Sequence, residues 1–140
     1  PLFPPEHFCR VIVDDPSRRK QFNKALDLLQ REGAIQIFWP PEESTRMPIM
    51  GAVGQLQFEV VAHRLKTDYG VEARFEPMSF RLARWVVGTP EDLETFEPSR
   101  LALKVADGND RLVCLFPSEW DFDYTAERNP KLQFLSVSPR

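Results

Sequence analysis

Few side chains of this 140-residue chain have the types and spacing that acid–base, nucleophilic or metal chemistry requires. Cys9 and Cys114 lie far apart and form neither a CxxC pair nor a Cys/His cluster, which are the patterns of redox and zinc sites. We interpret them as separate buried thiols in a reducing compartment. The histidines are His7 and His63, neither in an HExxH motif, and no partner for general acid–base catalysis by His63 can be identified.

Two pairs of adjacent carboxylates are the remaining candidates for acid–base work. Asp14-Asp15 precedes a predicted helix and is more simply explained as its N-terminal cap. Glu42-Glu43 lies in a polar segment that we interpret as a solvated loop. An enzyme would need clustered histidine, cysteine or acidic side chains, so we predict that this chain has no catalytic residue and no metal site.

The segment Gly51–Gly54 lies between a predicted strand and a predicted helix, where backbone N–H groups can bind an anion. A phosphate-binding loop also needs a lysine followed by serine or threonine, and this segment has none. Asn23-Lys24-Ala25-Leu26 lacks the aspartate of a guanine-reading motif. We therefore predict no cofactor in this chain and interpret the two glycines as a tight turn.

Arg18-Arg19-Lys20 is a compact basic run. It lies in the first turns of a predicted helix, where cations interact unfavourably with the helix dipole. The run is either a solvated face or a binding surface for phosphate or protein. Because the formal net charge is −3, a general nucleic-acid binder is disfavoured, and any RNA contact would come from a local patch. The sequence contains no run of 18 or more apolar residues, so it predicts no membrane-spanning helix.

Hydrophobic periodicity predicts the elements of the first half of the chain. One helix buries Phe22, Ala25, Leu26 and Leu29, and a second buries Phe58, Val61, Ala62, Leu65 and Tyr69 and ends at Gly70. Apolar runs predict strands at residues 7–13, 34–39, 48–53 and 71–76. Over residues 6–77 the order is β-α-β-β-α-β, an α+β fold of the ferredoxin-like, split βαβ type with both helices on one face of the sheet.

Residues 78–140 continue with predicted strands at 80–87, 101–106, 112–116 and 132–137, and short helices at 90–94 and after Ser118. The connection Met78-Ser79 is too short for a free hinge. We therefore expect a single domain, residues 1–140, made of the ferredoxin-like core and a β-rich C-terminal extension packed on it. Trp39, Trp85 and Trp120 are interpreted as packing residues.

The segment Gly51–Leu65, followed by Tyr69–Ala73, closely resembles the C-terminal domain of the bacterial class II peptide-chain release factor three family. Further matches span nearly the whole chain in order: Phe3–Phe8, Glu32–Phe38, Ala83–Val86 and Ala126–Pro130. The short run Gly54–Glu59 by itself is also similar to a pattern in the third domain of elongation factor G.

The resemblance implies a cytoplasmic translational GTPase that promotes dissociation of class I release factors from the ribosome after peptide release. This chain would be its non-catalytic third domain, following a GTPase domain that holds GTP and magnesium and a β-barrel domain. The family's domain contacts a small-subunit protein and ribosomal RNA, and neither a membrane nor DNA is an expected partner.

We expect ribosome contacts from the basic run of the first helix and the solvent-facing polar residues of the second. These candidates are Arg18, Arg19, Lys20, Gln55, Gln57, His63, Arg64 and Lys66. The alternative is a ferredoxin-like module that senses a small molecule or regulates a partner. That alternative predicts an apolar pocket with convergent polar groups at a sheet edge or a dimer interface.

Overall fold

The computed structural model describes residues 3–33, 35–41 and 47–139. In the first half, strands β1 (His7–Ile12), β2 (Gln36–Phe38), β3 (Ile49–Ala52) and β4 (Arg74–Met78) form one sheet. A 3-10 turn η1 (Pro16–Arg18) leads into helix α1 (Arg19–Arg31), and helix α2 (Leu56–Tyr69) precedes β4. The strand order is β2-β3-β1-β4 with every pair antiparallel. This confirms the predicted split βαβ unit.

Local capping residues explain where the two helices begin and end. The Asp15 carboxylate accepts a hydrogen bond from the Ser17 N–H at 3.0 Å, so the predicted cap is confirmed for the η1 turn that starts α1. Gly70 has a φ of 67°, and the Val71 N–H donates to the Leu65 carbonyl at 2.9 Å. This is the left-handed C-terminal cap that glycine adopts without steric cost.

The predicted strand at 71–76 is displaced in the structure, where β4 begins at Arg74 and ends at Met78. Val71 is fully buried, and its N–H completes the cap of α2 instead of joining the sheet. Met78 pairs with Phe8 of β1, so it belongs to the sheet and not to the connection. The carboxylates Glu42 and Glu43 lie outside the described residues.

The second half has the same topology as the first. Its elements are β5 (Leu82–Val87), α3 (Pro90–Glu94), β6 (Leu103–Ala106), β7 (Leu112–Phe116), α4 (Glu119–Arg128) and β8 (Gln133–Leu135). The strand order is β6-β7-β5-β8, again antiparallel throughout. The predicted extension is therefore a second split βαβ unit. The six elements were predicted in this order, but the strand pairing that makes them a split βαβ unit depends on contacts between distant segments.

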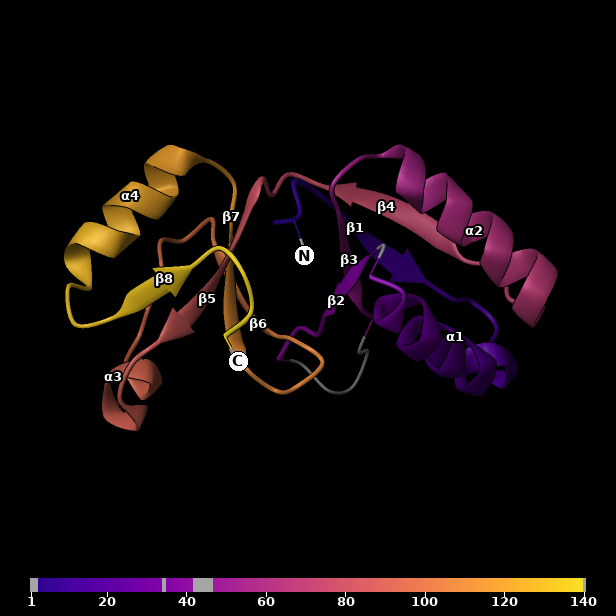
Figure 1. Cartoon of the computed structure of the whole chain (residues 1–140), viewed down its shortest axis with the longest axis horizontal. Helices are drawn as coiled ribbons and strands as arrows, with labels where there is room; N and C mark the ends of the chain where they lie inside the picture. Colours follow the sequence, from indigo (N-terminus) through magenta and orange to yellow (C-terminus); the bar gives the residue numbers. More distant parts are fainter. Residues whose placement is uncertain (1–2, 34, 42–46, 140) are drawn as a thin grey trace.

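The two sheets pack face to face and the helices cover the outer faces, giving helix, sheet, sheet and helix layers (Figure 1). Phe8 and Phe38 of the first sheet meet Trp85 of the second, with 6.0 Å between the ring centroids of Phe38 and Trp85. The edge strands also join, because Trp39 and Ala106 exchange backbone hydrogen bonds of 2.7 and 2.9 Å.

Asp107 links the buried Trp85 to a hairpin turn. One carboxylate oxygen accepts from the indole Nε1 at 2.9 Å. The other accepts from the backbone N–H groups of Asn109 and Arg111 at 2.8 and 2.9 Å. Because both oxygens have partners, the buried carboxylate is satisfied, and it also holds the hairpin turn between β6 and β7.

The predicted tight turn lies at residues 53–55, between β3 and α2, and contains Gly54 but not Gly51. Neither glycine has a positive φ; that conformation belongs to Gly33 and Gly70. Gly51 lies within β3, and a Cβ added there would lie 3.0 Å from both the Phe38 ring and Pro5. Glycine is therefore required at position 51 by the close approach of the aromatic side chains between the sheets.

Substitution Gly51→Ala should lower the free energy of unfolding by about 1–3 kcal/mol, as overpacking of a filled core does. Gly54→Ala is the matched control, because nothing lies within 4 Å of its added Cβ. Chemical denaturation of the two variants measures the difference. Equal stabilities would mean that the aromatic interface is loose enough to absorb a methyl group.

Substitution Asp107→Ala should cost about 2 kcal/mol, because it leaves a buried indole N–H and two turn N–H groups without their acceptor. The exposed Asp123 has no hydrogen-bond partner among the described residues, so Asp123→Ala serves as the control. Thermal unfolding compares them, and a neutral Asp107→Ala would show that water replaces the carboxylate.

Candidate functional site

The basic run lies exposed at the junction of η1 and α1, beside the end of α2. Arg18, Arg19 and Lys20 take part in no ion pair within the described part of the chain. Arg18 Nη1 lies 3.9 Å from the position that a Cβ would occupy on Gly70. Since Gly70 caps the C-terminus of α2, whose dipole end is negative, this neighbour offsets the unfavourable position of Arg18 at the start of α1.

Arg64 fixes α2 to the end of α1. Its guanidinium donates to both oxygens of Glu32 at 2.6 and 3.1 Å and lies 3.5 Å from Asp68. The hydrogen bond from Arg64 lowers the pKa of Glu32, and the same bond raises the pKa of Arg64. Arg64 is thus occupied within the fold, which the sequence could not show because Glu32 lies on another element.

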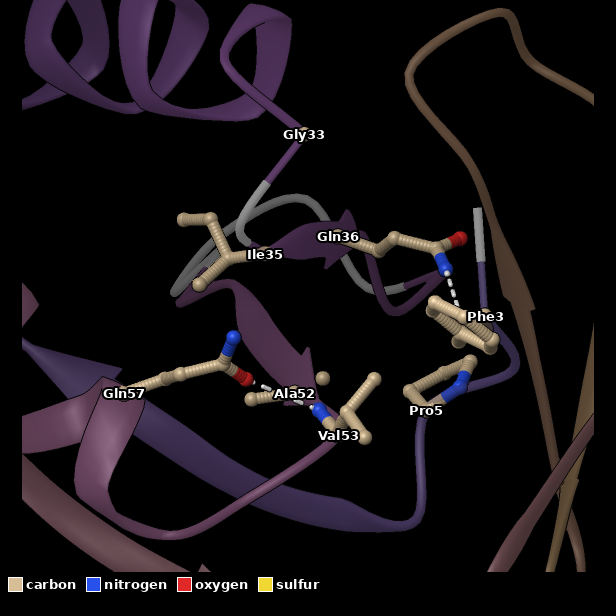
Figure 2. Close-up of a pocket in the computed structure, with 9 residues that line it drawn as sticks. Phe3, Pro5, Gly33, Ile35, Gln36, Ala52, Val53 and Gln57 are labelled. Carbon is tan, nitrogen blue, oxygen red and sulfur yellow. Dashed lines mark hydrogen bonds between the residues drawn. The ribbon is translucent and has the colours of Figure 1, made fainter. Parts of the chain in front are cut away.

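Gln57 also serves the fold. Its side-chain oxygen accepts from the backbone N–H of Val53 at 3.0 Å (Figure 2) and from that of Gly54 at 3.2 Å. These bonds hold the turn that leads from β3 into α2. A glutamine in the first turn of a helix can reach back to the backbone N–H groups that precede the helix, so the position of Gln57 was a signal for this role in the sequence.

The other candidates on α2 are exposed but do not form one patch. Lys66 lies 3.8 Å from Glu72 and is near the Gly70 end of the helix, together with the basic run. Gln55 is at the opposite end of the 14-residue helix, which spans roughly 20 Å. His63 lies between them on the exposed surface.

Lys24 was missed as a candidate. It is exposed on α1, one turn after Lys20, and has no ion pair within the described ranges. Arg31 pairs with Asp27 at 2.9 Å, and the Arg64 charge is compensated by Glu32. Among the described residues, the positive charges of the helix layer that form no ion pair are therefore concentrated at the start of α1.

A cavity of about 220 Å³ lies at the edge of the first sheet, beside β2 (Figure 2). Ile35, Val53 and Pro5 line it, together with the amides of Gln36 and Gln57. Gln36 donates to the Phe3 carbonyl at 3.5 Å, so both amides already bond the main chain. The cavity is smaller than typical ligand pockets of about 300–1,000 Å³, and the small-molecule alternative remains a hypothesis.

A larger groove of about 900 Å³ runs from the start of α2 past β4 to the connection between the two halves. Leu56 lines it and is 70% exposed, and Val60 on the next turn is 53% exposed. The groove reaches Glu6 and His7 at the start of β1. Exposed apolar side chains beside a groove are typical of an interaction surface.

Both cysteines are buried, and burial raises the pKa of each thiol to about 12. They are therefore protonated and unreactive at neutral pH, as the interpretation of buried single thiols predicts. Across residues 3–33, 35–41 and 47–139, no group of three or more His, Cys, Asp or Glu side chains is placed to hold a metal ion. No helix in those ranges is long and apolar enough to cross a membrane.

Substitution Arg64→Gln should raise the pKa of Glu32 toward its ordinary value, because the bidentate donor is lost. Since the folded-state pKa of Glu32 is lowered, the bond contributes stability at neutral pH and loses it as the pH falls through that pKa. NMR titration of the side-chain carboxyl carbons measures the shift.

The control is Arg74→Gln, which removes the same charge on β4. Arg74 lowers the pKa of Asp14 through a 2.9 Å hydrogen bond, so this variant should raise the pKa of Asp14 and leave that of Glu32 lowered. A Glu32 titration that is the same in both variants would contradict the assignment.

Comparison with known proteins supplies the family. Residues 1–126 match the family model described as "Class II release factor RF3, C-terminal domain". Proteins named peptide chain release factor 3 are 46% identical over 140 residues in Gloeobacter violaceus and 45% over 141 residues in Gloeothece citriformis. A further one in Synechocystis is 47% identical over 141 residues.

Each of these three alignments covers 99% of this chain and 26% of the relative, so the chain spans about a quarter of the length of the curated relatives. The family resemblance expected from the Gly51–Leu65 segment is thereby confirmed, and the chain belongs to the family of class II release factor RF3 C-terminal domains.

Proposed function

We propose that this chain is the ribosome-docking domain of a cytoplasmic GTPase of translation termination, and that it performs no catalysis itself. The whole protein would promote dissociation of class I release factors from the ribosome after peptide release. The observation that carries the docking proposal is the exposed basic surface formed by Arg18, Arg19, Lys20 and Lys24 at the start of α1, none of which forms an ion pair within the described residues. The family membership supports the wider role.

The chemistry of this basic surface suits ribosomal RNA. Phosphate groups are bound by arginine and lysine side chains that are not already paired within the protein. Because the chain as a whole is negative, with a formal net charge of −3, attraction of a phosphate backbone would be strongest where exposed cations without ion pairs cluster, as they do at the start of α1. The arrangement therefore favours one defined orientation on RNA over general binding.

The packing of the two sheets suits a domain that transmits a displacement. Phe8, Phe38 and Trp85 form a continuous buried layer between the halves, and close-packed interiors deform little under load. We propose that a GTP-dependent rearrangement in a preceding domain moves this chain as one body against the small-subunit protein and the RNA that it contacts.

The groove lined by Leu56 is the proposed contact for the preceding GTPase and β-barrel domains. The relatives are about four times longer than this chain, and a domain interface within one protein needs an accessible apolar surface. GTP and magnesium are expected on the preceding GTPase domain and not on this chain.

Reversing the charge of Arg18, Arg19 and Lys20 to glutamate in the full-length protein should weaken ribosome binding by about tenfold or more at low salt, since three phosphate contacts are lost. The slope of log affinity against log salt should also become shallower. Sedimentation or filter binding over a salt series measures both quantities.

The matched control reverses Arg100 and Lys131, which are exposed residues of the second half, and is compared with the reversal of Arg19 and Lys20 alone, which changes the net charge equally. Circular dichroism confirms that each variant is folded. An unchanged affinity of the triple variant across the salt series, or an equal loss in the two double variants, would remove the basic run from the docking surface.

A further inference from the structure

Helix α4 places two aromatic side chains on the surface of the second half. Trp120 is 69% exposed and Tyr124 is 38% exposed, which overturns the interpretation of Trp120 as a packing residue. The physical reason is the register of the helix, because Phe122 and Thr125 take the face toward the sheet and positions 120 and 124 share the outer face. Trp85 is buried, and Trp39 packs against the first core as predicted.

The exposed side chains form an ordered stack along the helix. The rings of Trp120 and Tyr124 are 5.4 Å apart and inclined by only 12°. The guanidinium of Arg128 lies 4.4 Å from the Tyr124 centroid. Trp120 is the outermost ring of this stack, and within the described residues neither a cation nor any ring other than that of Tyr124 contacts it. A large indole surface is therefore held in place but left open to a partner.

The aromatic residues of α4 already show which group they accept. Tyr124 holds Arg128 on the outer side, and Phe122 holds Arg84 on the inner side at 5.0 Å from its centroid. Arginine binds aromatic faces by cation–π attraction and stacking, and tryptophan is the strongest aromatic acceptor. The open indole of Trp120 is thus suited to a further guanidinium.

The charge around the stack selects the class of partner. Helix α4 contains four carboxylates and one arginine. Asp123 and Glu127 follow Trp120 at i+3 and i+7, on the same side of the helix, and neither forms an ion pair in the described part of the chain. Such a surface repels phosphate groups and attracts cations, which favours a basic protein segment over RNA.

We propose that the outer face of α4 is a docking surface for an arginine-bearing segment of a protein partner. Trp120 stacks on a guanidinium of that segment, and Asp123 and Glu127 pair with its other cations. This surface lies on the opposite side of the molecule from α1 and α2 (Figure 1). The surface contains none of the residues of the basic run. The proposal for α4 therefore does not depend on the proposed function.

The test measures binding of a fluorescently labelled oligoarginine peptide to the whole 140-residue chain by anisotropy at low salt. Trp120→Ala should raise Kd about three- to fivefold, the size of an exposed cation–π contact. Trp120→Leu keeps apolar area without the π face and should weaken binding similarly. The double substitution Asp123→Asn with Glu127→Gln should also weaken it, and the effect should fall at higher salt.

The matched control is Glu91→Gln with Glu94→Gln on α3, which changes the net charge equally at two exposed residues and should affect Kd less. Wild-type affinity in both Trp120 variants, or an equal loss in the α3 control, would overturn the proposal. An oligolysine peptide of the same length should show a smaller dependence on Trp120, and an equal dependence would refute the assignment to arginine.

A single-stranded oligouridylate is the comparison for RNA. The acidic face predicts no binding that depends on Trp120. Oligouridylate binding that Trp120→Ala weakens would overturn the choice of a protein partner in favour of base stacking. Melting temperatures of all variants are measured first, and because Trp120 is exposed they should match the wild type.

Discussion

The packing of aromatic side chains between the two sheets is the contact on which the rest of this structure depends. Each half is a four-stranded sheet with helices on one face only, so each would expose an apolar sheet face if it stood alone. Phe8, Phe38 and Trp85 fill the space between those faces. Burial of such surface is the main favourable term in folding, and it makes the two units depend on each other.

Several secondary features follow from this contact. Gly51 has no side chain because the Phe38 and Phe8 rings occupy the space above β3. The indole N–H of Trp85 cannot reach solvent, so Asp107 is buried beside it as an acceptor. The same carboxylate shapes the hairpin between β6 and β7. The conformation of this surface turn therefore depends on how Trp85 packs in the core, because one carboxylate bonds both.

The outer layers differ in how their charges are used. On α1 and α2, Arg64 and Arg31 are paired within the layer, whereas the basic residues at the start of α1 form no ion pair within the described residues. On α4 the carboxylates outnumber the single arginine, and that arginine lies over Tyr124. The molecule therefore presents surfaces of opposite electrostatic character on its two sides, suited to partners of different chemistry.

The sequence by itself determined the first split βαβ unit and the ends of its helices. Phe22, Ala25, Leu26 and Leu29 repeat with the helical period and are all buried, and Gly70 takes the left-handed cap that its position indicated. These features are local, because periodicity and capping depend on residues within a few positions of each other. The family was also readable from the Gly51–Leu65 segment.

Only the tertiary structure decided which polar residues are available and how the second half is built. Gln57 and Arg64 resembled surface residues in the sequence, but their partners are the turn before α2 and Glu32 at the end of α1. The elements of the second unit were predicted in their order along the chain, but its strand order arises from pairing between distant segments. Trp120 is exposed because Phe122 and Thr125 set which face of α4 meets the sheet, a choice made by packing and not by residue type.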